Sequence, residues 1–254
     1  MMAMSRSERL GTASLLLLAV CVVIVAALVT GRGPNMDYVP QMAERPVISE
    51  SGGPLYVQAH EVTIAEWNRC HADGACTLLL RPPRGGEAEQ WPATGLNWLD
   101  VNEYLNWINR VSRHRFRLPT AREWYAMAEP VLPEEPDPIF TDPSLSWASD
   151  YLLEQRTGRR LQPSGSWSTT EEGIADLNGS VWEWTQDCYI DDSDTAKTPM
   201  CPAYHVGGEH EAVIPFLVRD PARGGCAVGA PPPHLGMRLV TENALPAIHS
   251  SEPG

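Results

Sequence analysis

Residues 173–184 decide the fold of this chain and read G-I-A-D-L-N-G-S-V-W-E-W. If Val181–Trp184 forms a strand, successive side chains lie on opposite faces of that strand. Trp182 and Trp184 then share one face, and Glu183 lies on the other. The pattern therefore predicts a strand with one apolar face and one face that carries a carboxylate.

The same stretch places two carboxylates close to a turn. Asp176 lies seven residues before Glu183, and Gly179 between them lets the backbone turn back. Both carboxylates and nearby carbonyl oxygens can then converge on one hard cation, so the spacing predicts a calcium-type site. In the alternative interpretation, Asp176 and Glu183 accept N–H bonds within the loop, without a metal.

Composition favours an irregular, loop-rich domain. The chain has 254 residues, and the part after the first fifty or so suits one domain of about 200 residues, with two small domains as the alternative. Nine Trp against three Phe predict a core of indole rings whose N–H groups need partners, and 23 Pro with 20 Gly predict many loops. A formal charge of -13 argues against a basic face that binds nucleic acid or an anionic lipid surface.

The N-terminal region predicts a membrane anchor. Residues 11–31 contain no charged side chain, and a helix of that length reaches roughly 31 Å, enough to span a bilayer. Arg6 and Arg9 place residues 1–10 in the cytoplasm. We expect a single-pass signal anchor in the inner membrane with the domain in the periplasm, and a cleaved signal peptide is the alternative.

Five cysteines follow this span, and an oxidising compartment favours their pairing. Cys70 and Cys76 bracket a short loop, and Cys188 with Cys201 form the next plausible pair. Cys226 is then left over, as a buried and inert thiol, a reactive one, or one bonded to another chain. Pairing of Cys226 with Cys188 or Cys201 is also compatible with the spacing.

The chain divides into a tether, a domain and a tail. Residues 32–54 carry Gly, Pro and mixed polar side chains without periodicity, as expected for a linker from the membrane. The folded domain is expected over residues 55–241, and residues 242–254 form a flexible tail.

Helix and strand signals occur in the first half of the domain. Residues 55–62 alternate as a strand does, and Thr63 can cap the helix that follows. Residues 99–111 have apolar side chains at helical spacing. Thr120, with Glu123 three positions later, has the capping-box pattern that begins another helix.

Several separated segments match one set of motifs in order and spacing. They are Glu61-Val62-Thr63 with Trp67; Pro92, Trp98, Asp100 and Tyr104; Arg117-Leu118-Pro119-Thr120 with Glu123 and Trp124; residues 173–184, with Ser180 in place of Asn; Arg223-Gly224-Gly225; and Gly236-Met237-Arg238. On these residues the chain resembles the formylglycine-generating enzyme, or sulfatase-modifying factor, family over nearly the whole of residues 55–240. The resemblance implies an α+β, C-type-lectin-like fold with little regular secondary structure.

The resemblance also implies a ligand set for calcium. In the family, the counterparts of Asp176, Gly179, Val181 and Glu183 bind a structural calcium ion, two through side chains and two through backbone carbonyls.

The founding activity of the family oxidises a substrate cysteine to formylglycine, with copper(I) held by two thiolates just after the R-G-G-S signature. Copper(I) prefers such soft ligands. Here Cys226 stands in place of the signature Ser, and residues 227–235 contain no Cys. We therefore expect the copper oxidase activity to be lost, and Cys226 and Trp182 remain the candidate catalytic residues. His234 could supply a second ligand, although a histidine after three prolines is typical of a solvated loop.

Three functions follow from these expectations. The first is a non-catalytic binding or assembly module, or a subunit of an envelope complex, whose partner is an envelope protein. The second is a protein-maturation enzyme with altered chemistry at Cys226. The third, carbohydrate recognition through calcium, rests on fold analogy alone.

Overall fold

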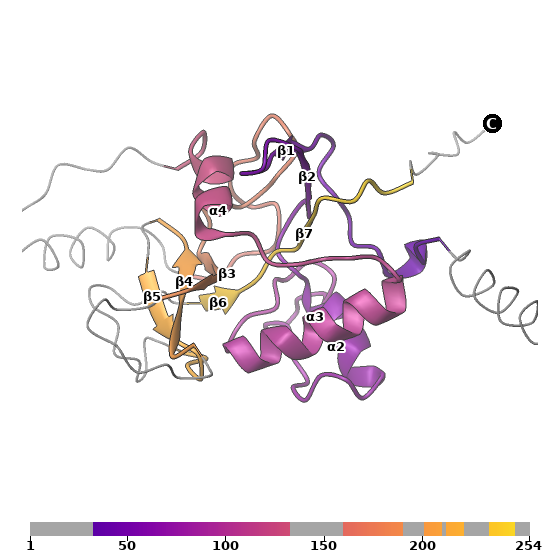
Figure 1. Cartoon of the computed structure of the whole chain (residues 1–254). Coiled ribbons are helices and arrows are strands. Elements are labelled where there is room, and N and C mark those ends of the chain that lie inside the picture. Colours follow the sequence, from indigo (N-terminus) through magenta and orange to yellow (C-terminus); the bar gives the residue numbers. More distant parts are fainter. Residues whose placement is uncertain (1–32, 133–159, 190–200, 210–211, 221–233, 247–254) are drawn as a thin grey trace, which may run out of the picture.

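A computed structural model describes residues 33–132, 160–189, 201–209, 212–220 and 234–246 of the chain (Figure 1). The anchor expected over residues 11–31 and the candidate Cys226 lie outside these residues. None of the helices within the described ranges is long and apolar enough to cross a membrane.

The described chain is a mixed α+β fold built from short elements. In chain order they are η1 (Met36–Tyr38), β1 (Val47–Ile48), β2 (Pro54–Val57), α2 (Ile64–Ala72), α3 (Trp98–Ser112), α4 (Ala121–Ala128), β3 (Val181–Cys188), β4 (Ala203–Gly207), β5 (Ala212–Pro215), β6 (His234–Gly236) and β7 (Val240–Thr241). The strands form two small sheets, with orders β1-β2-β7 and β5-β4-β3-β6. Strand β6 runs parallel to β3, and the other pairs are antiparallel. In Figure 1, α4 lies above the four-stranded sheet, and α2 and α3 lie to its lower right.

Each of the three described α-helices begins with a complete capping box. The N-cap and N3 residues are Thr63 and Glu66 in α2, Asn97 and Asp100 in α3, and Thr120 and Glu123 in α4. In each box both side chains bond the backbone of the other residue, which satisfies two N–H groups that the first turn leaves without helical partners. The helices predicted after Thr63 and Thr120 are confirmed, and the helix predicted over 99–111 extends by one residue at each end.

The strand predicted over residues 55–62 is shorter than expected. Strand β2 ends at Val57, and the residues after it bond individually to the chain around β7. The amide of Gln58 donates to the carbonyl of Leu239 at 2.9 Å, and the amide of Val62 donates to that of Met237, also at 2.9 Å. These bonds hold individual residues of the stretch and do not form the regular register of a ladder.

Residues 33–54 differ from the expected tether, because they lie against the domain. The amide of Asn35 donates to the carbonyl of Ser112 at 2.6 Å, and the amide of Ala43 donates to that of Val57 at 2.8 Å. Strand β1 also pairs with β2. These bonds make the segment from residue 33 onward part of the folded unit.

The first residue of the expected tail is also held. The guanidinium of Arg117 forms an ion pair with Glu242, just beyond β7. The other arm of this guanidinium binds Glu123 in the first turn of α4. Arg117 therefore links the end of the domain to α4.

Indole rings fill the core, as the composition predicts. Within the described part of the chain, five tryptophans are almost completely buried: Trp67, Trp107, Trp124, Trp182 and Trp184. Four of them donate their ring N–H at 2.8–2.9 Å: Trp67 to the carbonyl of Leu78, Trp107 to Asp73, Trp124 to Glu183, and Trp184 to the carbonyl of Leu96. A buried indole without such a bond would leave an unsatisfied donor, which is costly.

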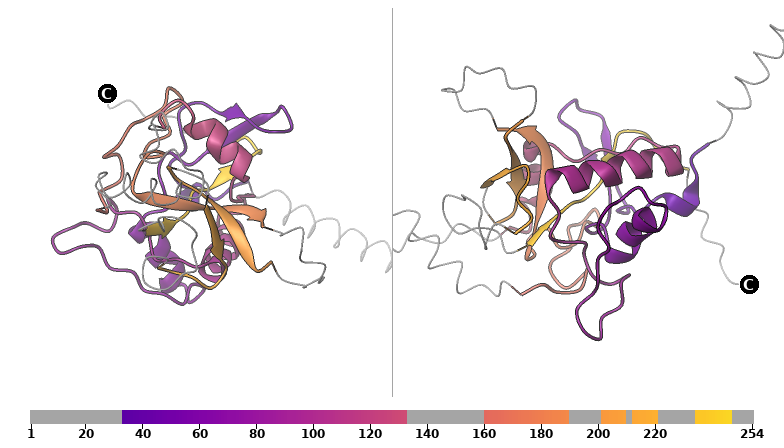
Figure 2. Two further views of the ribbon diagram at one scale, coloured as in Figure 1. Left: turned by 90° about the vertical axis from the view of Figure 1, so that its left-hand side faces the viewer. Right: turned by 90° about the horizontal axis from the view of Figure 1, so that it is seen from below.

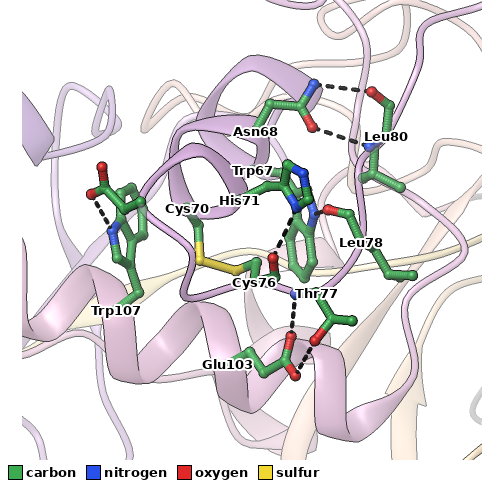
Figure 3. Close-up of a disulfide and its surroundings, with 11 residues drawn as sticks. Trp67, Asn68, Cys70, His71, Cys76, Thr77, Leu78, Leu80, Glu103 and Trp107 are labelled. Atoms are coloured by element: carbon green, nitrogen blue, oxygen red, sulfur yellow. Dashed lines mark hydrogen bonds between the residues drawn. A yellow bond between two sulfur atoms is a disulfide. The ribbon is translucent and has the colours of Figure 1, made fainter.

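Both predicted disulfides are present. Cys70 is bonded to Cys76 in the buried region between α2 and α3 (Figure 3), and Cys188 is bonded to Cys201 where β3 and β4 adjoin. The alternative pairings of Cys226 with Cys188 or Cys201 are therefore excluded in this structure.

Candidate functional site

Strand β3 carries the signature residues and separates its two faces as predicted. On one side, Trp184 Nε1 donates to the carbonyl of Leu96 at 2.8 Å. On the other, Glu183 Oε2 accepts from Trp124 Nε1 of α4, also at 2.8 Å. The carboxylate face of β3 therefore meets α4, and the tryptophan face meets the segment that leads into α3.

Two consecutive glycines at the end of β4 allow this close packing. A Cβ added to Gly207 would lie 2.1 Å from the ring of Trp124, and a Cβ added to Gly208 would lie 2.2 Å from the ring of Trp182. No real side chain tolerates such distances. The absence of a side chain at both positions lets one indole ring rest on each face of the backbone.

A buried ion pair forms the centre of the site. Arg238 Nη2 lies 2.9 Å from Glu183 Oε1, and Arg238 Nε lies 3.1 Å from Oε2; both side chains have zero solvent exposure. The remaining guanidinium donors bond the carbonyls of Gln58, at 3.0 Å, and Ala175, at 2.8 Å. Burial by itself would lower the pKa of Arg238, but Glu183 and Glu61 outweigh it and raise that pKa.

Asp176 is held by the backbone of its own loop. Its Oδ1 accepts the amide of Trp167 at 2.9 Å, and its Oδ2 accepts the amide of Gly165. The residue has a φ of 66°, in the left-handed region that Asp tolerates better than most residues. Its carbonyl accepts the amide of Gly179 at 2.8 Å, which closes the turn that the sequence predicts.

Glu61 completes the cluster and lacks a full set of partners. The residue is 2% exposed, and its Oε2 has no hydrogen-bond partner among the described residues. Burial raises the pKa of Glu61 to about 8; Glu183 and Asp176 add to the shift, and Arg238 opposes it. Three carboxylates therefore surround one guanidinium, and a proton on Glu61 lowers the excess of negative charge.

The roles of Glu61 and Arg238 were missed at the sequence level, although both lie in the motifs quoted above. The available signal was Arg238 itself, which stands between Met237 and Leu239 in a run that is otherwise apolar. A cation in such a run must be paired when it is buried. The sequence does not indicate which carboxylate pairs with it.

The side chains of the two acidic residues predicted to bind calcium already accept hydrogen bonds from the protein. The two oxygens of Glu183 receive N–H donors from Arg238 and Trp124, and each oxygen of Asp176 receives a backbone N–H. A dication would also be repelled by the guanidinium. Gly179 and Val181, the other two predicted ligands, lie between these two carboxylates in the chain. These contacts correspond to the metal-free interpretation, which a comparison of the domain with and without calcium would test.

The other candidate residues are not brought together. Trp182 is 2% exposed and lies in the main core cluster, so its ring is not at the surface. His234 begins β6 and is half-buried. Cys226 lies outside the described residues.

Comparisons with known proteins agree with this architecture. Residues 24–243 match the profile of the family described as sulfatase-modifying factor enzyme 1-like domain. The structure of PvdO from Pseudomonas aeruginosa is similar, with a TM-score of 0.50 at 16% identity, over 78% of this chain and 89% of that chain. Treponema denticola variable protein 1 gives a TM-score of 0.49 at 13% identity, over 84% of this chain and 94% of that chain.

One curated relative is the serine/threonine-protein kinase pkn1 of Chlamydia pneumoniae, which is 28% identical over 137 residues. The match includes 53% of this chain but spans only 19% of the kinase. The profile match covers most of the chain and contains every signature described above. The chain therefore belongs to the sulfatase-modifying factor enzyme 1-like domain family.

Proposed function

We propose that this chain is a membrane-anchored, extracytoplasmic module that binds an envelope protein and does not itself catalyse a reaction. The observation that carries the proposal is the complete burial of the Glu183–Arg238 pair. A catalytic group must reach its substrate, whereas these side chains form their hydrogen bonds with each other and with Trp124, Gln58 and Ala175. The most distinctive polar residues of the family signature thus serve the fold, and function is left to the surface.

The two disulfides support an extracytoplasmic location. Structural disulfides persist in oxidising compartments and are rare in the reducing cytosol. Cys70–Cys76 and Cys188–Cys201 both lie in the described domain, downstream of the apolar residues 11–31. An anchor with its domain outside the cytoplasm is compatible with both features.

The loss of the copper chemistry is the second part of the proposal. A two-coordinate copper(I) centre needs two soft ligands, and between Arg223 and Arg238 the sequence contains Cys226 as its single thiol. Incubation of the full chain with copper(I), oxygen and a cysteine-containing sulfatase peptide should give no aldehyde. Formation of the aldehyde, detected by mass spectrometry, would contradict this reading.

A co-purification experiment distinguishes the module from the alternative enzyme. We expect the tagged full chain, extracted from membranes in mild detergent, to retain a stoichiometric envelope protein, and the Cys226→Ser variant to retain the same protein. Loss of cellular function in Cys226→Ser, with the fold and the partner intact, would instead support an enzyme that acts through this thiol.

A further inference from the structure

The loop between α2 and α3 contains a segment, residues 77–84, that side chains of α2 hold along one edge. The side-chain amide of Asn68 bonds Leu80 twice: its Nδ2 donates to the carbonyl at 3.0 Å, and its Oδ1 accepts the amide at 3.1 Å (Figure 3). Trp67 Nε1 donates to the carbonyl of Leu78 at 2.9 Å. Asn68 therefore takes the place of a neighbouring strand on this edge.

The start of the segment is also held to the helices. Thr77 bonds Glu103 of α3 twice, through its amide and its hydroxyl, each at 2.8 Å (Figure 3). The preceding residue, Cys76, is joined to Cys70 of α2 and is 3% exposed. This segment is thus ordered before any partner arrives, which lowers the entropy cost of binding.

The opposite edge of the segment is open. Leu78 and Leu80 are half-buried and pack against the core, whereas Leu79 between them is 55% exposed. The backbone N–H and C=O of Leu79 have no hydrogen-bond partner among the described residues.

Two exposed arginines lie at the end of this edge. Arg81 and Arg84 form no ion pair with any residue in the described ranges, in a chain whose formal charge is -13. Arg84 lies in a tight turn closed by the amide of Gly86 and the carbonyl of Pro83 at 2.9 Å, with a φ of 82° at Gly85. In both views of Figure 2 the loop that follows α2 projects from the body of the domain.

We infer that residues 77–84 are a docking edge for an extended, acidic segment of the partner protein. Its backbone would pair with Leu79, an apolar side chain would cover the exposed leucine, and its carboxylates would meet Arg81 and Arg84. Main-chain hydrogen bonds supply affinity in this mode of recognition, and the side chains supply specificity. The inference rests on the proposed function and identifies the surface that performs it.

Charge decides between this partner and two others. A second copy of the chain would present the same edge, where the carboxylate of Glu103 is already bonded to Thr77. An anionic membrane would repel the acidic domain, and two arginines attract such a surface only weakly. Glu87 and Glu89 follow in the sequence and limit the positive charge to the short stretch that contains Arg81 and Arg84.

Peptide selection on the full chain in nanodiscs tests the inference. Phage-displayed random octapeptides should yield sequences in which Asp or Glu alternates with apolar residues. Synthetic versions should bind the wild type and lose at least tenfold in affinity with Leu79→Glu or Arg81→Glu. Leu217→Glu is the matched control, because Leu217 is 56% exposed at a different site. The peptides should bind this variant with the same affinity as the wild type. The amide of Leu79 should exchange rapidly in the free protein and become protected when the peptide binds.

Several outcomes would overturn the inference. They are the absence of enriched acidic peptides, equal binding to Leu79→Glu, dimerisation that Leu79→Glu abolishes, and protection of residues 77–84 in nanodiscs of anionic but not neutral lipid. Retention of the co-purified envelope protein by Leu79→Glu would refute this docking edge and leave the proposed function standing. Failure of the wild type to retain any partner would instead refute the proposed function.

Discussion

Arg238 and Glu183 form a fully buried ion pair, with 2.9 Å between Nη2 and Oε1, that links the C-terminal strands of the domain to β3. The pair replaces the water that both ions lose on burial, and the carbonyls of Gln58 and Ala175 complete the shell of Arg238. Such pairs add little stability compared with an apolar core, but removing one partner leaves the other charge buried without a counter-ion.

Arg238→Met should therefore lower the free energy of unfolding by about 3–5 kcal/mol. Urea denaturation followed by tryptophan fluorescence measures this change. Arg45→Met is the control, since the Arg45–Glu171 pair is exposed and its loss should cost at most about 1 kcal/mol. Equal effects of the two substitutions would contradict the structural role of Arg238.

Gly208→Ala should destabilise the domain by about 1–3 kcal/mol, the usual cost of overpacking a core. The added methyl would lie 2.2 Å from the ring of Trp182, so the sheet or the ring must move. Gly53→Ala should have little effect, because its nearest neighbours would be 3.9 Å away. Thermal melting of both variants checks the contrast.

Glu61 should make the fold less stable as pH rises. Burial raises its pKa from the ordinary value of 4.5 to about 8, so between these values the folded protein keeps a proton that the unfolded chain releases. Stability therefore falls across this window. Glu61→Gln should flatten the dependence of the free energy of unfolding on pH between pH 5 and 8, measured by urea denaturation. Glu171→Gln, at an exposed site, should leave this dependence unchanged.

Glu123 should act in the opposite direction at acid pH. Burial alone would raise its pKa, but hydrogen bonds from Arg117 and from the backbone of Thr120 outweigh burial and lower it. The unfolded chain then binds this proton more readily, so the contribution is complete above 4.5 and is lost as pH falls through the folded pKa. In Glu123→Gln the free energy of unfolding should decrease less steeply as the pH falls below 4.5. An unchanged decrease would refute the lowered pKa of Glu123.

Calcium should not shift the melting temperature of the domain. The oxygens of Asp176 and Glu183 already accept N–H groups from the protein, and Arg238 lies beside Glu183. A ligand that binds only the folded state raises stability by mass action. A higher melting temperature in calcium than in EDTA would mean that these carboxylates turn towards a metal, as the family resemblance implies.

Local signals carried much of the fold prediction. Thr63, Thr120 and their N3 glutamates lie within one helical turn of the bonds that they make, so the helix starts could be read directly. The short separations of the two cysteine pairs also favoured the bonds that form. Residues 33–54 were misjudged, because their hydrogen bonds go to distant segments and leave no periodic pattern.

Spacing and motifs predicted the family, the starts of α2 and α4, the Cys70–Cys76 pair and the division of β3 into a tryptophan face and a glutamate face, whereas for Cys188–Cys201 they left alternatives with Cys226 open. These features depend on spacing over a few residues, or on motifs that can be read in order. The pairing of Glu183 with Arg238, 55 residues away, and the position of Asn68 beside residues 77–84 depend instead on contacts in three dimensions. The physical reason is that a buried charge or an unpaired strand edge is defined by what packs around it, and packing joins residues that the sequence keeps far apart.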